Sequence, residues 1–262
     1  MTFDLTDSLR RLIFASIFAC TALAHAEPPW NVDDPGTTDN GAGIFYLNYS
    51  LEKLKSGDET ETIQNLAVTL GLTASTELGI YLPFVRSTTP SQESTINLNN
   101  YSWSLKHRFW ENEKGDALAI SGQLAVPTDR AKESLHSNIF TGNLGLTSQL
   151  QLQAWKLVAQ IAASQPIQPN SRPSWLYGAV LSSNIGQDAF AGIQAYSTLQ
   201  PGGPREVTDV MVGVGGGANI SKSTAVQAQL SRGFNDIEWV AYAGLTLTAE
   251  KSKLSTPTNP AP

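Results

Sequence analysis

The three histidines are the side chains best suited to acid–base or nucleophilic chemistry, and none stands in a pattern that predicts catalysis. His25 lies in an apolar N-terminal stretch, His107 falls on the apolar face of an alternating segment, and His136 lies in a polar segment beside serines and a glutamate. A catalytic nucleophile must be activated by a base that a third group orients. A histidine in a polar loop is ordinarily solvated instead. We therefore expect no catalytic residues and no enzymatic activity.

Metal ligands are equally sparse. Cys20 is the single cysteine, and no two histidines stand at the spacing that a zinc site needs. The acidic segment KSGDETE, residues 55–61, could hold Ca²⁺ weakly or could simply keep a loop solvated, and its composition favours solvation. We expect neither a metal site nor a cofactor.

A set of charged and polar side chains suggests a different chemistry, the selection of solutes in a pore. In a narrow, partly dehydrated channel, a few fixed charges of one sign bias which ions enter. The same cations could pair with carboxylates and brace the channel wall, and the sequence leaves both alternatives open. The candidates for the channel lining are Lys106, Arg108, Lys156, Glu77, Tyr81, Gln123, Asn143, Gln149, Gln227 and Gln229.

Strands with two different faces would have to position these side chains. In NLAVTLGLT, residues 65–73, leucines and a valine alternate with small or polar residues. Strict alternation of this kind is typical of a β-strand with a different environment on each face. In a membrane barrel the apolar face meets lipid and the mixed face lines a wet interior.

Twelve such segments follow one another, with turn residues between them and no amphipathic helix. Each reaches the roughly 9–11 residues that a tilted strand needs to cross a bilayer. Every backbone polar group in lipid must be paired within the protein, so such a sheet has to close on itself. We therefore expect an all-β fold, an antiparallel up-and-down transmembrane β-barrel of about twelve strands. The segments are 41–54, 62–74, 77–87, 98–111, 116–127, 138–151, 154–165, 173–184, 188–199, 208–220, 223–233 and 237–249.

The connections between the segments fall into two classes. Those after the even-numbered segments are short, as in TAST and NIGQD. Most of the others are longer and rich in Pro, Ser, Glu and Asp, as in STTPSQESTIN and PTDRAKESLHS. Outer-membrane barrels have short periplasmic turns and longer extracellular loops. A soluble β-sandwich gives no reason for this sorting.

Composition excludes other classes of protein. A net charge of −6 gives no basic surface for nucleic acid. Mean hydropathy is −0.15, and no apolar run beyond the N-terminus is long enough for a spanning helix. The partners that we expect are outer-membrane lipid, the barrel assembly machinery and a small-molecule solute.

The N-terminus has the features of an export signal. Arg10 and Arg11 precede an apolar stretch that is too short to span a bilayer and ends in the small-residue cleavage pattern Ala24-His25-Ala26. Cys20 would leave with this signal. The polar, proline-rich C-terminus reads as a disordered tail. The expected division is a signal peptide at 1–26, a periplasmic or plug segment at 27–40, the barrel at 41–249 and the tail at 250–262.

Four short motifs stand in a recognisable order, namely Asp33-Asp34-Pro35, Thr76-Glu77-Leu78-Gly79, Leu105-Lys106-His107-Arg108-Phe109 and Val126-Pro127-Thr128-Asp129. They resemble the outer-membrane proteins grouped as the MetA-pathway of phenol degradation family. The resemblance runs from about residue 27 to about residue 130, with looser agreement to about 249. The chain departs from the family pattern because no glycine follows Thr128 and no aromatic residue ends the chain.

The resemblance implies a barrel in the outer membrane of a Gram-negative bacterium, with a part in the uptake of aromatic or other hydrophobic compounds. Our interpretation is a porin-like barrel that admits small molecules passively. Two alternatives remain, a closed structural or adhesive barrel whose loops bind a partner, and a soluble periplasmic β-protein.

The export signal is directly testable. Protein recovered from an outer-membrane fraction should begin near Glu27, because Ala24 and Ala26 present small side chains at the cleavage positions. N-terminal sequencing measures this. Recovery of a lipidated Cys20 at the N-terminus would contradict the prediction.

Overall fold

The part of the chain that the computed structural model describes contains thirteen β-strands. The expected signal peptide, residues 27–30 and the expected C-terminal tail lie outside it. Within the described residues, no helix is both long and apolar enough to cross a membrane. The described residues are 31–55, 59–89, 92–98, 100–128, 140–167, 171–199, 201 and 207–249. The strands are β1 (Gly43–Leu54), β2 (Glu59–Thr73), β3 (Thr76–Thr89), β4 (Gln92–Leu98), β5 (Tyr101–Glu111), β6 (Ala117–Val126), β7 (Thr141–Leu152), β8 (Trp155–Pro166), β9 (Ser174–Asn184), β10 (Ala189–Leu199), β11 (Val207–Ser221), β12 (Thr224–Gly233) and β13 (Ile237–Ala249).

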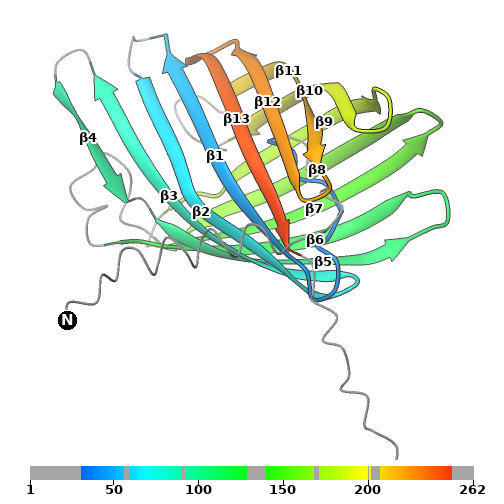
Figure 1. Cartoon of the computed structure of the whole chain (residues 1–262). Coiled ribbons are helices and arrows are strands. Elements are labelled where there is room, and N and C mark those ends of the chain that lie inside the picture. The colour runs from blue at the N-terminus through cyan, green and yellow to red at the C-terminus, as the bar shows by residue number, and fades with distance from the viewer. Residues whose placement is uncertain are drawn as a thin grey trace, which may run out of the picture.

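The strands close into a barrel (Figure 1). From β5 to β13 each strand pairs antiparallel with the next, and β13 pairs with β1 from Gly43↔Ala249 onward. β1 then pairs with β2, and the pairing of β2 with β3 completes the circle. β5 and β4 pair with successive parts of β3, so together they occupy one place in the wall. The expected antiparallel barrel of twelve strands is confirmed.

Strands extend into two of the expected loops. The segment 87–97 was expected to be a loop, but β3 and β4 continue through it as a hairpin that is paired as far as Thr89↔Gln92. Likewise β2 begins at Glu59, inside the acidic segment 55–61. The segment 87–97 contains three threonines and the segment 55–61 contains one, and β-branched residues favour extended pairing even where the sequence is polar. The polar composition of these two segments therefore marked where the apolar part of each strand ends. The strands themselves continue beyond that point.

Side chains sort by face along each strand. In β12, Ala225, Gln227, Gln229 and Ser231 are buried, whereas the residues between them are exposed. Successive side chains of a strand point to opposite faces, so one set lines the interior and the other the outside. The inward set here is mainly polar, which is the reverse of a soluble protein.

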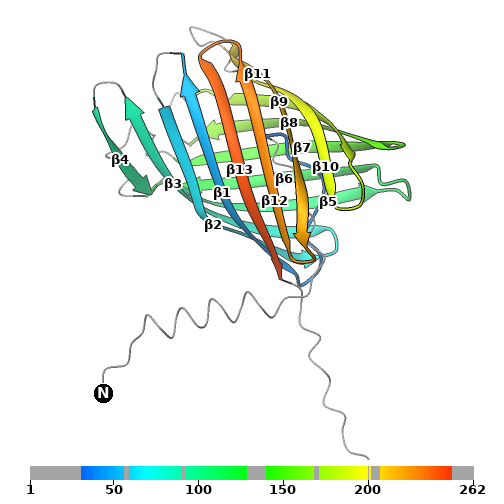
Figure 2. The same ribbon diagram turned by 45° about the horizontal axis from the view of Figure 1, so that its top comes forward.

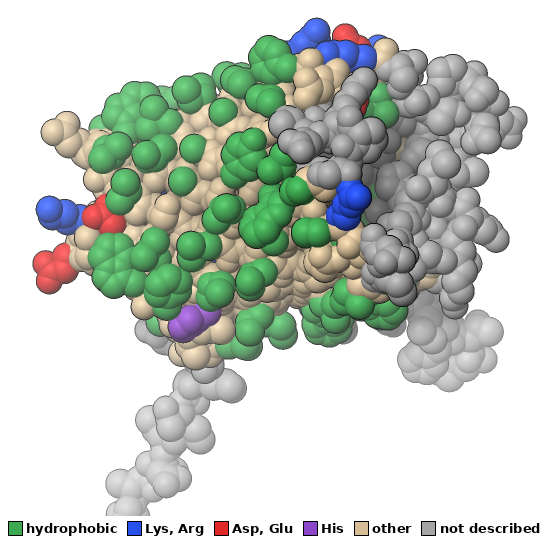
Figure 3. All heavy atoms as spheres, turned by 180° about the vertical axis from the view of Figure 1, so that it is seen from behind, with side chains coloured by type: hydrophobic (Ala, Val, Ile, Leu, Met, Phe, Trp, Pro, Cys, Tyr) green, Lys and Arg blue, Asp and Glu red, His purple; other side chains and the backbone are tan. Residues whose placement is uncertain are grey.

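The outer face of the barrel is apolar (Figure 3). Leucine, valine, isoleucine and aromatic side chains spread across it, and the Lys, Arg, Asp and Glu side chains visible in this view lie toward its edges. The exposed set includes Leu47, Leu105, Leu144, Ile161, Ile193, Val214 and Leu230. A continuous apolar surface of this extent on a soluble monomer would be exceptional. It fits lipid.

The short turns share one rim of the barrel (Figure 2). The chain enters β1 at this rim, because Gly41 N–H donates to the Gly71 carbonyl, and it leaves β13 there, where Thr248 N–H donates to Ser223. The turn between β5 and β6 is held by Asp116, which accepts from Gln151 N–H and from the Asn112 side chain. These hydrogen bonds hold the pKa of the Asp116 carboxyl below its usual value.

An arginine on the lipid face should destabilise the barrel in a depth-dependent way. Leu105 lies in the middle of β5 and is half exposed. Leu105→Arg should cost about 2–4 kcal/mol of folding free energy if this level is the bilayer midplane, whereas Leu152→Arg, at the rim end of β7, should cost about 0–1 kcal/mol. Unfolding of the two variants in vesicles measures the difference. Equal costs would contradict the assigned lipid face.

Candidate functional site in the barrel lumen

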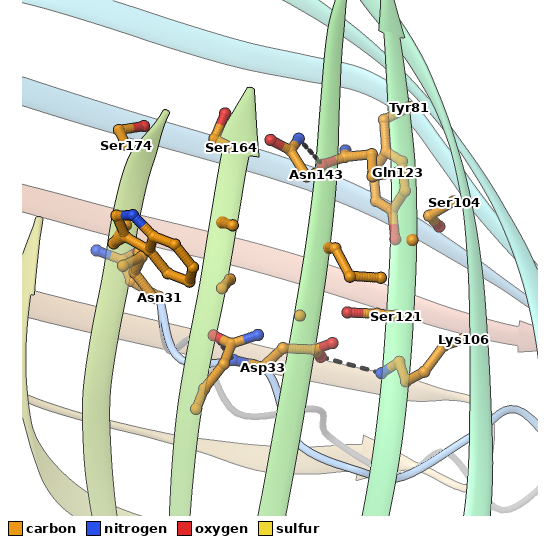
Figure 4. Close-up of a pocket in the computed structure, with 18 of the residues that line it drawn as sticks. Asn31, Asp33, Tyr81, Ser104, Lys106, Ser121, Gln123, Asn143, Ser164 and Ser174 are labelled. Carbon is orange, nitrogen blue, oxygen red and sulfur yellow. Dashed lines mark hydrogen bonds and ion pairs between the residues drawn. The ribbon is translucent and has the colours of Figure 1, made fainter. Parts of the chain in front are cut away.

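The segment 31–42 runs inside the barrel, where its blue trace can be followed in Figures 1 and 4. At its start, Asn31 N–H donates to Gln194 of β10 across 3.1 Å. Asp33 N–H then donates to Gln160 of β8 across 3.1 Å. The segment thus crosses the lumen from β10 and β8 toward β2 and β3, and it forms a floor.

Lys106 is the centre of an ion network on this floor. Its Nζ lies 3.0 Å from Asp33 Oδ1 and 3.3 Å from Glu77 Oε1. It also donates to the carbonyl of Asp34, and the carboxylate of Asp34 lies 3.5 Å from Lys156 Nζ. Three carboxylates and two ammonium groups leave a net charge of −1 on these five side chains. Lys106 and Glu77 lie side by side because β3 and β5 pair them in register.

The far end of the segment is fixed by Thr38. Its N–H and hydroxyl donate to Glu77 Oε2 across 2.7 and 2.8 Å, and the Thr38 and Thr69 hydroxyl oxygens lie 2.9 Å apart. Glu77 therefore bonds both to Lys106 on the wall and to the segment. A carboxylate that accepts several charge-assisted hydrogen bonds is strongly oriented.

Glycines in the wall make room for the segment. A Cβ added at Gly71 would overlap the carbonyl oxygens of Thr38 and Asp39. A Cβ added at Gly178 would lie 2.7 Å from a methyl group of Val32. Val32 itself is buried against Val158 and Val180. At Gly71 and Gly178 the inner wall therefore leaves space that the segment occupies, and we call this space the seat of the segment.

A cavity of about 420 Å³ lies above this floor (Figure 4). It extends from Asp33 and Lys106 toward the long-loop ends of β8 and β9 at Ser164 and Ser174. A smaller cavity of about 210 Å³ lies at the short-turn end, next to Lys156. The polar residues that line the larger cavity include Asn31, Thr69, Glu77, Tyr81, Ser104, Ser121, Gln123, Asn143, Gln160 and Thr198.

Five of the ten residues proposed from sequence for the channel lining meet in the larger cavity. An amide chain crosses its wall, in which Asn143 donates to Gln123 across 2.9 Å and Gln123 donates to Ser102 across 2.8 Å. Lys156 lies in the smaller cavity instead. The five in the larger cavity are Lys106, Glu77, Tyr81, Gln123 and Asn143.

Four other candidates lie elsewhere. Arg108 was expected beside Lys106 in the lumen, but its guanidinium donates to the Ala74 carbonyl at the short-turn rim and pairs with Glu111 across 3.3 Å. A bulge follows Arg108 and ends the regular register of β5. Gln149 likewise donates to a turn carbonyl, that of Gly115.

Gln227 and Gln229 lie inside the barrel on the β12 wall, away from the residues of the larger cavity. Gln227 donates to the Tyr242 hydroxyl, which donates to Asn48 across 2.7 Å. Gln229 donates to Ser231 across 2.7 Å. The amide nitrogens of both glutamines are thus bonded within the barrel.

Sequence reasoning missed the contribution of the N-terminal segment. Asp33 and Asp34 were noted only as part of a family motif, and nothing in their pattern places them against Lys106 or Lys156. Gln160 was also missed, although it alternates with Val158 on the inward face of β8 and period-two counting finds it.

Catalytic and metal-binding geometry is not seen in the described residues. His107 is exposed and its Nδ1 lies 2.9 Å from the Thr76 hydroxyl. Within the described ranges, no group of three or more His, Cys, Asp and Glu side chains could hold a metal ion. His136 lies outside these ranges.

Solved structures with the same fold are outer-membrane proteins. The chain is similar to the COG4313 outer membrane channel from Pseudomonas putida F1, with 17% identity, 86% of this chain and 100% of that chain covered, and a TM-score of 0.64. It is also similar to the KdgM porin, with 8% identity, 77% and 98% covered, and a TM-score of 0.53. The translocator domain of the autotransporter NalP from Neisseria meningitidis gives 12% identity, 80% and 90% covered, and a TM-score of 0.51.

At these identities the likeness establishes the fold. No protein-family model matches the chain, and no curated protein matches it.

The seat at Gly71 can be tested by disulfide trapping. In a Cys20→Ser background, Thr38→Cys with Thr69→Cys should cross-link, because the two hydroxyl oxygens lie 2.9 Å apart. Adding Gly71→Ala should reduce the cross-linked fraction, since overpacking costs about 1–3 kcal/mol and the three atoms nearest to the new methyl group belong to the segment. Gel mobility with and without reductant measures it.

Gly122→Ala is the matched control, because a Cβ there meets nothing within 4 Å. If both alanine variants cross-link as well as the parent protein, Gly71 does not seat the segment.

Proposed function

We propose that the protein is a passive channel for small molecules in the outer membrane of a Gram-negative bacterium. The observation that carries the proposal is the inverted polarity of the barrel, an apolar outside around a polar lumen that contains a cavity of about 420 Å³. Lipid around the barrel explains its apolar outer face, and water in the lumen explains its polar inner face. The fold shared with outer-membrane channels and porins supports this role.

The aromatic residues support a position across a bilayer. Trp110 and Trp155 are exposed near the short-turn rim, and Trp175 is exposed near the opposite rim. Aromatic girdles mark both interfaces of membrane barrels. We propose that outer-membrane lipid surrounds the wall, that the barrel assembly machinery inserts it after cleavage of the signal peptide, and that the short turns face the periplasm.

Two observations bear on the nature of the solute. The sequence resemblance to the MetA-pathway of phenol degradation family favours membership of that family and uptake of aromatic or hydrophobic compounds. The residues of the larger cavity favour a polar path, since most of their side chains are hydroxyls, amides or charged groups. We propose small solutes as the class that passes through, without an enzymatic step.

A closed structural barrel is the second candidate, because the floor formed by residues 31–42 is bonded to the wall at both of its ends. In that case the long loops would be the working surface. The two candidates differ in one measurable property, conductance.

Lys106→Gln tests the channel electrically. Removal of this ammonium leaves Asp33 and Glu77 without their shared cation, so the floor becomes more negative and the conducted current should shift toward cations. Conductance should also rise as the floor loosens. Reversal potentials across a KCl gradient in planar bilayers measure the shift.

Lys114→Gln is the control, since Lys114 is exposed in the turn between β5 and β6. Heat-modifiable gel migration confirms that each variant is folded. Complete absence of current from folded parent protein and folded variants would reject the channel and favour the closed barrel.

A further inference from the structure

Several polar groups of the larger cavity have no hydrogen-bond partner among the residues that the structure describes. Among the described residues, no hydrogen bond is made by the hydroxyls of Ser104, Ser121, Ser164 and Ser174 or by the amide nitrogen of Gln160. Each lines the cavity, and they extend from the floor to the long-loop end of the wall (Figure 4). A hydroxyl both donates and accepts, and the Gln160 amide nitrogen adds donors. These five side chains therefore form a row of hydrogen-bond donors and acceptors along the wall, which we call the track.

The charged groups of the same cavity are already engaged. Lys106 contacts two carboxylates, and Glu77 uses one oxygen for Lys106 and the other for Thr38. A charged solute would have to compete with these contacts, and beside any group of opposite charge it would meet a group of its own charge. A neutral solute meets no such cost.

A glycine keeps the middle of the track open. Gly145 of β7 lies between Ser121 and Gln160, and a Cβ added there would lie 2.7 Å from Ser121 Oγ and 3.4 Å from Gln160 Nε2. A larger side chain at this position would fill the space that both groups face. The cavity volume of about 420 Å³ falls within the usual range of small-molecule sites, about 300–1,000 Å³.

We infer that this cavity is a binding site for neutral, hydroxyl-rich solutes of about sugar size. The inference rests on the proposed channel only for access to the lumen, and it assigns the solute class that the channel selects. Hydroxyl groups on such a solute donate and accept, as the serines and Gln160 do. An aromatic hydrocarbon would leave these wall groups without partners when it displaced their water, and unpaired buried polar groups reduce affinity.

Ligand binding can be measured without any flux. Purified full-length mature protein in detergent is titrated with methyl β-D-glucoside by ligand-observed NMR, with glucuronate and glucosamine as charged analogues of similar size. The neutral glucoside should bind about tenfold more tightly than either analogue, because it satisfies the wall without disturbing the ion network. Toluene should not displace it.

Gly145→Val should weaken glucoside binding about tenfold or more by filling the track. Gly142→Val is the matched control on the same strand, since a Cβ at Gly142 meets nothing within 4 Å, and it should bind as the parent protein does. Equal or tighter binding of a charged analogue, displacement by toluene, or unchanged binding in Gly145→Val would overturn the inference.

The same samples in planar bilayers separate the two proposals. Glucoside binding together with no current would reject the channel and keep the site. Current without glucoside binding would keep the channel and reject the site.

Discussion

Closure of the sheet is the constraint on which the rest of the structure depends. A membrane offers no partner for a free N–H or C=O group, so a spanning sheet cannot have an open edge. The pairing of β13 with β1 joins the first and last strands and removes both edges that an open meander would leave. Once the wall is closed, period-two alternation makes one face an interior. The polar residues of that face then meet across a lumen although they lie far apart in the sequence.

The ion network shows what closure makes possible. Lys106 has a side chain only 10% exposed, and it would be costly to bury without partners. Glu77 reaches it through strand pairing, whereas Asp33 reaches it only because the N-terminal segment enters the barrel. Glu77 then joins the two by accepting from Thr38. The wall and the segment therefore stabilise each other. Lys106, the cation of the wall, takes its second carboxylate partner from a part of the segment that does not pair with a neighbouring strand.

Sequence analysis succeeded where the physics is periodic and local. Alternation located each wall strand within a few residues and assigned Gln227 and Gln229 to the inside. It failed where local rules compete. Threonine-rich polar residues continued the β3–β4 hairpin beyond its apolar band, and the bulge after Arg108 ended the register at the rim. The floor of the lumen could not be predicted from the sequence. Asp33 and Asp34 follow no periodic pattern, and their partner Lys106 lies more than 70 residues away in the chain.

The interior is unevenly filled, and this limits where a solute can pass. On the β10–β13 side, Gly213 of β11 lies beneath a bridge in which Gln194 donates to Ser231 across 3.1 Å. The bridge between the Gln194 amide and Ser231 thus occupies the space that this glycine leaves. On the β6–β8 side, the atoms nearest to a Cβ at Gly145 would belong to Ser121, the tip of Gln160 and Ala162, and all of these residues line the larger cavity. The two glycines therefore differ in their surroundings, since Gly213 lies under a side-chain hydrogen bond and Gly145 borders the larger cavity. For the channel that we propose, the larger cavity beside Asp33 and Lys106 is therefore the expected route of a solute.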